Sequence, residues 1–211
     1  MRFVFKFGIL ATVLAVVLHF QKDVDFWLQH FFYPDSTWWI PSNSALLHTL
    51  FYEIPRTLPW IAGVLILVLA VIRYRKIKKL EARWIQSLVF LSLLPVLIGG
   101  LKAVTGQACP NAFQSFGGIL ADSVLYFKGQ RCFPGGHVSA GFALLGVCFL
   151  IFSVQRRVWV VALILIWSLV IGFYQMGRGV HFTSDTLATL GLAALLYAVV
   201  SRLFPASSSP I

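Results

Sequence analysis

Long, continuous apolar runs alternate with short polar segments along the chain. Several runs approach the roughly 20 residues that a helix needs to cross the hydrocarbon core of a bilayer. The strands of a membrane barrel alternate between apolar and polar residues instead, so continuous runs argue against a barrel. The pattern therefore predicts an all-α, polytopic membrane protein. Its six expected transmembrane helices are residues 1–20, 58–72, 84–101, 137–154, 158–174 and 186–200.

The first apolar run has the beginning of a secretory signal, because Arg2 and Lys6 precede it. No small-residue cleavage site follows it, so we interpret it as an uncleaved span. The next segment, 21–53, mixes tryptophans with carboxylates and contains two prolines. Tryptophan favours the headgroup zone and proline interrupts helices, so we expect an extramembrane loop with a short interfacial helix. Residues 1–204 are expected to form a single domain, and 205–211 a disordered tail.

Composition and charge agree with a membrane protein. The 211 residues are 59% hydrophobic and 11% charged, and the mean hydropathy is +0.84. The net charge of +10 does not predict nucleic-acid binding, because the basic residues stand mostly in short loops between spans, such as 73–83 and 156–157. Six of the seven acidic residues fall on the other side, all except Glu81. By the positive-inside rule, both termini are predicted to be cytoplasmic.

The candidate chemistry stands at the predicted outer, periplasmic ends of the spans. If the chain is helical from Val180 onward, His181 and Asp185 are an i,i+4 pair, and the carboxylate holds one imidazole nitrogen. A lone histidine beside an apolar run is usually structural. Here, however, His137 and Lys102 stand at the outer ends of two further spans. These four residues therefore predict one shared site.

The residue types at this site suit a phosphate. Gly135 and Gly136 precede the fourth span, and a helix N-terminus presents free N–H groups and the positive end of a dipole. Lys102 and Arg178 add positive charge. Of two imidazoles, one can attack phosphorus while the other protonates the leaving oxygen. Since no metal-binding cluster is evident, we expect a phosphohistidine mechanism without a metal or cofactor.

The same residues resemble the three motifs of the type 2 phosphatidic acid phosphatase (PAP2) superfamily: K-x6-R-P, P-S-G-H and S-R-x5-H-x3-D. Here the first reads K-x6-C-P from Lys102, the second reads P-G-G-H up to His137, and the third keeps H-x3-D from His181 to Asp185. Their order and loop placement match over about 84–200. The resemblance implies a six-helix PAP2-like bundle. It also implies that His181 is the nucleophile, Asp185 its partner, His137 the general acid and Lys102 a phosphate ligand.

The chain departs from these motifs at three positions. Cys109 stands where the first motif has arginine, and Gly135 replaces the serine of the second. Gln175 occupies the arginine position of the third motif, whereas Arg178 lies three residues later, about one helical turn away. At least one phosphate-binding charge is therefore missing or supplied elsewhere. Two loop residues could restore it, although solvated loop charges are commoner: Arg131 and Lys128.

Cys109 and Cys132 fall in the same predicted loop, 103–136. If the loop faces an oxidising compartment, they could form a disulfide. In the motif alignment each cysteine lies close to a proline of the first or second motif, so a disulfide would join the two phosphate-facing segments. The alternative is two unpaired small residues.

The leading hypothesis is a phosphatase that removes phosphate from a membrane lipid at the outer face of the bilayer. Lipid A is slightly favoured as the substrate, with undecaprenyl pyrophosphate and phosphatidylglycerol phosphate close behind. A lipid phosphotransferase with the same catalytic residues is an alternative. A non-catalytic transporter or haem-binding bundle is another, because histidine and arginine inside a membrane often mark ion pathways. The expected partners are a lipid phosphate and the bilayer.

Overall fold

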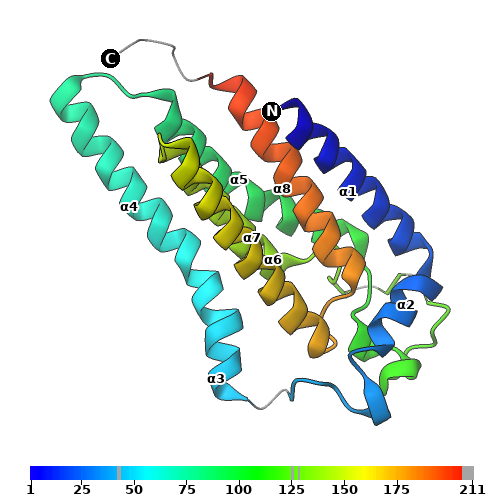
Figure 1. Ribbon diagram of the computed structural model, residues 1–211. Coiled ribbons are helices and arrows are strands. Elements are labelled where there is room, and N and C mark those ends of the chain that lie inside the picture. The colour runs from blue at the N-terminus through cyan, green and yellow to red at the C-terminus, as the bar shows by residue number, and fades with distance from the viewer. Residues whose placement is uncertain (42–43, 125, 128, 206–211) are drawn as a thin grey trace.

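The computed structural model describes residues 1–41, 44–124, 126–127 and 129–205, and within these residues it contains helices and no strand. Two sequence predictions fall wholly or largely outside that range, namely Lys128 and residues 206–211 of the expected tail. In the described part, five helices are long and apolar enough to cross a membrane. They lie side by side in one bundle (Figure 1). They are α1 (Arg2–Phe20), α4 (Ile54–Ile77), α5 (Ala82–Thr105), α7 (Val154–Gly177) and α8 (Thr183–Leu203).

The fourth predicted span is shorter than expected. It begins as α6 (Gly136–Ala143) and continues as a 3-10 helix, η5 (Leu144–Leu150). With helical rises of about 1.5 and 2.0 Å per residue, the two parts together reach about 26 Å, slightly less than a typical hydrocarbon core. The basic residues expected in a loop after this span instead lie in the first turn of α7, which begins at Val154.

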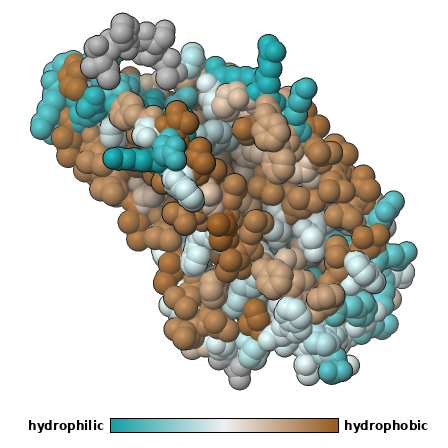
Figure 2. Space-filling view, viewed as in Figure 1, coloured by the Kyte–Doolittle hydropathy of each residue, from teal (hydrophilic) through white to brown (hydrophobic). Residues whose placement is uncertain are grey.

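The two ends of the bundle differ in character. The N-terminus of α1 and the C-terminal end of α8 lie at the same end as the turn between α4 and α5, and the short helices α2 and α3 lie at the opposite end (Figure 1). Brown, apolar side chains cover most of the face shown in Figure 2, with teal residues gathered toward both ends. At the first end, Glu81 accepts ion pairs from Arg73 and Arg83. Which end faces the cytoplasm remains a prediction from charge.

Small residues allow α1 and α8 to pack closely. Gly8, Ala11 and Ala15 are the buried positions of α1. A Cβ atom on Gly191 of α8 would lie 2.7 Å from the backbone nitrogen of Thr12. Close approach through small residues is the usual way that helices associate in membranes, where no hydrophobic effect drives them together. This contact fixes α8, and with it the segment that precedes α8.

A cap, expected to lie outside the membrane, covers the end of the bundle that holds the C-terminus of α1 and the beginning of α8 (Figure 1). It contains the predicted interfacial helix, α2 (Lys22–His30), and Phe26 of this helix packs against Phe113 and Phe182. Trp38 packs against this aromatic cluster, and its expected place in the headgroup zone stays a prediction. The remaining short elements are η1 (Pro34–Ser36), α3 (Ala45–His48), the π-helical turn η2 (Thr49–Glu53), η3 (Pro110–Ala112) and η4 (Gln114–Phe116).

The α1–α8 contact predicts the effect of adding one methyl group. Gly191→Ala is expected to lower the free energy of unfolding by about 1 to 3 kcal/mol, because the new atom meets the backbone of Thr12. Gly100→Ala in α5 is the matched control, since no atom lies within 4 Å of its Cβ position. Thermal unfolding in detergent measures both. Equal melting temperatures for the two variants would contradict close α1–α8 packing.

Candidate active site

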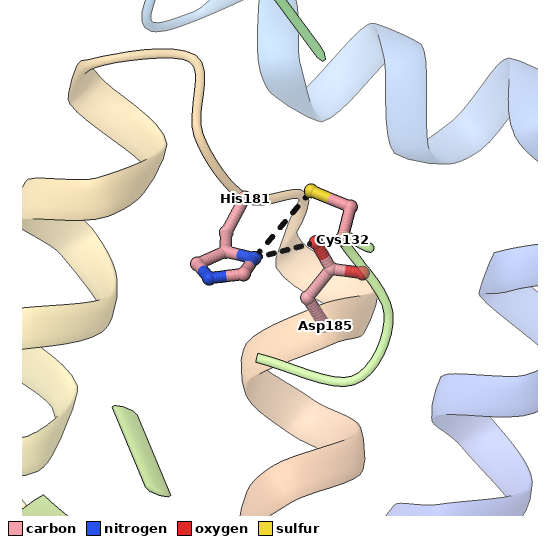
Figure 3. A group of neighbouring side chains, drawn as sticks. All are labelled: Cys132, His181 and Asp185. Atoms are coloured by element: carbon pink, nitrogen blue, oxygen red, sulfur yellow. Dashed lines mark hydrogen bonds and ion pairs between the residues drawn. The ribbon is translucent and has the colours of Figure 1, made fainter. Parts of the chain in front are cut away.

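The beginning of α8 holds the central pair of the site. His181 lies before the helix, which begins at Thr183, and Phe182 between them is extended. Asp185 Oδ2 accepts the backbone N–H of Phe182 at 2.8 Å and lies 3.0 Å from His181 Nδ1 (Figure 3). The predicted contact therefore forms, but not as a helical i,i+4 pair. The carboxylate caps the helix and orients the imidazole at the same time.

The second imidazole lies directly opposite the first. His137, in the first turn of α6, has its Nδ1 atom 3.1 Å from His181 Nε2. His181 is 1% exposed. This burial, reinforced by the positive charge of Lys102, lowers the pKa of His181 well below its ordinary value. A neutral His181 that donates Nδ1–H to Asp185 has a lone pair on Nε2, on the side of His137.

Backbone contacts join α6 to α8 at this point. The Gly135 N–H donates to the carbonyl oxygen of Asp185 at 3.0 Å, and the Thr189 hydroxyl donates to the carbonyl oxygen of Gly135 at 3.1 Å. A Cβ atom on Gly135 would lie 3.1 Å from the Asp185 carbonyl oxygen. That distance is tight, so glycine in place of the motif serine permits the close approach that brings His137 to His181.

Lys102 and Arg131 lie on the α5 and loop side of the site. Lys102, in the last turn of α5, passes so close to the start of α6 that a Cβ atom on Gly136 would lie 3.0 Å from Nζ. Arg131 is an exposed residue of the loop before α6. Lys102 therefore lies beside the free N–H groups of the α6 N-terminus, which is the arrangement expected for a phosphate site.

Arg178 occupies a different position from the one expected. The helical-turn argument fails, because α7 ends at Gly177 and Arg178 lies in the turn that follows. Its guanidinium carbon is 5.3 Å from the ring centre of Tyr174. Gln175, at the motif arginine position, is fully buried, and its amide has no hydrogen-bond partner among the described residues. Arg178, and not Gln175, is therefore the charged residue at this end of α7.

Cys109 and Cys132 are joined by a disulfide, with their Cα atoms 5.1 Å apart. Cys132 Sγ lies 3.6 Å from His181 Nδ1, so the bridge abuts the catalytic candidate itself (Figure 3). Cys132, His181 and Asp185 present ligand-type atoms within 4.8 Å of one another. In the disulfide, however, the sulfur is not the thiolate that binds a metal ion. The donor set therefore fits a covalently closed loop better than a metal centre.

Sequence reasoning missed two residues near His137, namely Tyr52 in the turn before α4 and Arg56 in α4. A cavity of about 210 Å³ lies beside the imidazole of His137, with Tyr52, Arg56, Lys102, Gly136 and Ala140 as its other lining residues. The mixed composition of 21–53 hid Tyr52 in an expected loop. Arg56 stood just before the apolar run of the second span. Their spacing of four residues would place both side chains on one face of a helix, but nothing in the sequence connects that face with His137.

Asp25 was also missed. It lies on α2, is 3% exposed, and accepts hydrogen bonds from the backbone N–H (3.2 Å) and the hydroxyl of Ser184. Burial raises its pKa to about 7, against the opposing effect of the Ser184 hydrogen bonds. The carboxyl group thus attaches the cap to the first turn of α8, one residue from Asp185. Only the fold brings residue 25 to residue 184.

Comparison with known proteins identifies the family. The profile of the PAP2 superfamily matches residues 82–209, more than half of the chain. The chain belongs to the PAP2 superfamily. It is therefore a membrane phosphatase, and its family supports lipid phosphates as substrates.

The fold agrees with this membership. It is similar to the crystal structure of a transmembrane PAP2-type phosphatidylglycerolphosphate phosphatase from Bacillus subtilis, with a TM-score of 0.64 and 16% sequence identity over 96% of each chain. At that identity the similarity shows the fold alone. No curated protein matches the sequence.

The disulfide predicts sensitivity to reduction. It closes a loop with a sequence separation of 23, so replacing both Cys109 and Cys132 by serine is expected to lower the free energy of unfolding by about 3 kcal/mol. Thermal unfolding with and without reductant measures this. Cys148→Ala, which removes the buried free cysteine, is the control and should keep the full response to reductant. A parent protein with three titratable thiols would contradict the bridge.

Asp25 predicts a pH dependence of stability. Its folded pKa of about 7 lies above the ordinary value near 4, so the folded state holds this proton more tightly than the unfolded state. Its contribution to the free energy of unfolding therefore falls as pH rises from about 4 to about 7. We expect the melting temperature to fall less over pH 5 to 8 in Asp25→Asn than in the parent. Parallel curves would exclude a raised pKa at Asp25.

Proposed function

We propose that this protein removes phosphate from a membrane lipid at the outer, periplasmic face of the bilayer, through a phosphohistidine intermediate. The observation that carries the proposal is the buried chain of groups from His137 to His181 to Asp185, with contacts of 3.1 and 3.0 Å. A nucleophile, a proton donor and an orienting carboxylate are the parts that such a reaction needs. The two histidines face cations on several sides.

In the first step, phosphate enters the site and His137 gives up its contact with His181. The His181 Nε2 lone pair attacks phosphorus, and the bond from phosphorus to the lipid oxygen breaks. The electron pair leaves on that oxygen, which takes a proton from the His137 imidazolium. Asp185 accepts Nδ1–H of His181 and stabilises the positive imidazolium that forms. Lys102, Arg131 and Arg178, together with the N–H group at Gly136, would offset the charge on phosphate oxygens, whereas the Gly135 N–H is held by the Asp185 carbonyl.

In the second step, water attacks the phosphohistidine. His137, now neutral, takes a proton from the water, and the bond from phosphorus to His181 Nε2 breaks. Inorganic phosphate leaves, and both imidazoles return to their starting protonation states. Over the two steps, His181 gains and then loses the phosphoryl group, and His137 loses and then regains one proton. The cycle therefore requires no metal or redox partner.

An apolar groove beside the site supports a lipid substrate. It has a volume of about 540 Å³ and is lined by α4, α5 and the start of α6. It shares Arg56, Gly136 and Ala140 with the smaller cavity beside His137. Its walls are mostly aliphatic and open between membrane-spanning helices. A hydrocarbon chain in this groove would place the attached phosphate beside His137.

Lipid A remains the first substrate to test, since an outward-facing site suits it. Undecaprenyl pyrophosphate and phosphatidylglycerol phosphate follow, the latter because the similar Bacillus subtilis structure is named for that activity. The outward placement rests on the basic residues at the end where Arg73, Arg83 and Glu81 lie. Both termini would then be cytoplasmic.

The test is phosphate release by purified protein in detergent, with chelator present, from these three lipids. His181→Ala and His137→Ala are expected to lower kcat by at least about 100-fold, because each removes a group that transfers phosphorus or a proton. His30→Ala is the control, since this exposed histidine of α2 lies outside the site.

Brief reaction with a labelled lipid should also trap acid-labile phosphate on the parent and none on His181→Ala. Equal phosphate release by the parent and both site variants would contradict the proposal. Label recovered in a second lipid, with no inorganic phosphate, would instead establish a phosphotransferase.

A further inference from the structure

The site contains an uncharged residue at two positions where the family motifs have arginine. Cys109 is tied up in the disulfide, and Gln175 is a buried amide. Arg178 lies near one of these positions, in the turn after α7. A further positive charge comes from an unexpected element. Arg56 lies on α4, outside residues 82–209 that the family profile matches.

Arg56 and Lys102 line the same cavity of about 210 Å³ beside His137. Among the described residues that line this cavity there is no carboxylate, so its charged lining is purely cationic. A pocket with two cations and an imidazole suits a phosphate dianion.

The local helix geometry directs Arg56 toward this cavity. The π-helical turn η2 runs directly into α4, and π-helical turns are frequent at functional sites. Tyr52 and Arg56 are four residues apart across this junction, so they share a face. Tyr52 packs against the ring of His137, with ring centres 4.8 Å apart, and against His48 on its other side, at 4.5 Å. This stacking fixes the face of the helix that bears Arg56.

Arg56 has no ion-pair partner among the described residues. Within the described part of the chain, no carboxylate oxygen lies within 4.0 Å of its guanidinium, whereas Arg73 at the other end of α4 pairs with Glu81 at 2.6 Å. Arg56 also lines the apolar groove. It therefore stands where the polar cavity and the hydrocarbon path meet, with its hydrogen-bond donors available.

We propose that Arg56 is a phosphate-binding residue of this enzyme, which replaces from α4 the arginine that the first motif lacks. With Lys102 it holds the phosphate of a lipid phosphate ester whose hydrocarbon chain lies in the groove between α4 and α5. The planar guanidinium binds two phosphate oxygens in a fork, and Lys102 binds as a point charge. This assignment rests on the proposed function and adds to it the element that recognises the phosphate.

The experiment compares Arg56→Ala and Arg56→Lys with the parent. Arg75→Ala is the matched control, because it removes the same side chain from the opposite end of the same helix. The measurements are kcat, KM for a lipid phosphate, and the inhibition constant of inorganic phosphate. For Arg56→Ala we expect KM and the phosphate inhibition constant to rise about 10- to 100-fold, as for loss of a charge-assisted hydrogen bond. Arg56→Lys should lie between that variant and the parent, and Arg75→Ala should match the parent.

A second readout does not depend on turnover. Inorganic phosphate should raise the melting temperature of the parent, since a ligand that binds only the folded state stabilises it. Arg56→Ala should lose most of this rise, whereas Arg75→Ala should keep it. If Arg56→Ala does not fold, as judged by gel filtration, Arg56→Gln removes the charge while it retains most of the side-chain volume.

The outcomes separate the two proposals. A parent that hydrolyses lipid phosphates, with KM and phosphate inhibition in Arg56→Ala or Arg56→Gln within twofold of its own, overturns the role of Arg56 and leaves the proposed function intact. A parent that hydrolyses none of the lipids contradicts the proposed function. The phosphate-dependent melting temperatures then still decide whether Arg56 binds phosphate.

Discussion

The interaction on which the site depends is the capping of α8 by Asp185. One carboxylate oxygen accepts the backbone N–H of Phe182 and also contacts His181 Nδ1, so the start of the helix and the orientation of the imidazole are fixed together. Because the pair is buried, water does not compete for these hydrogen bonds, and their loss would leave a polar group unpaired. Any displacement of α8 along its axis therefore displaces the candidate nucleophile.

Several independent contacts hold the α8 N-terminus in place. The small residues of α1 allow that helix to pack along α8, and Asp25 of α2 hydrogen-bonds Ser184 in its first turn. The disulfide closes the loop before α6 and lies against His181. The backbone contact between Gly135 and Asp185 then brings in α6 with His137. The membrane-spanning bundle and the cap thus both hold the short segment at the start of α8 in place.

The site also uses a part of the chain that lies outside the residues matched by the family profile. The segment before residue 82 contributes Tyr52, which packs on His137, and Arg56, which lines the cavity. The same helix α4 forms one wall of the apolar groove. The cavity beside His137 and the apolar groove therefore share α4 as a wall. A change in its tilt would affect both.

Hydrophobic periodicity alone determined that the chain is helical and membrane-spanning, because a run of about 20 apolar residues has few other stable environments. Residue type and order also determined the His137, His181, Asp185 and Lys102 set, since each stands at the end of an apolar run. Pattern could not determine that η5 is a 3-10 helix, or that α8 begins only at Thr183, because both depend on packing against neighbours. Nor could it find Asp25 or Arg56. Asp25 lies 159 positions before its partner Ser184, and Arg56 lies 81 positions before His137, whose cavity it lines. Positions so far apart in the sequence come close only after the helices have packed.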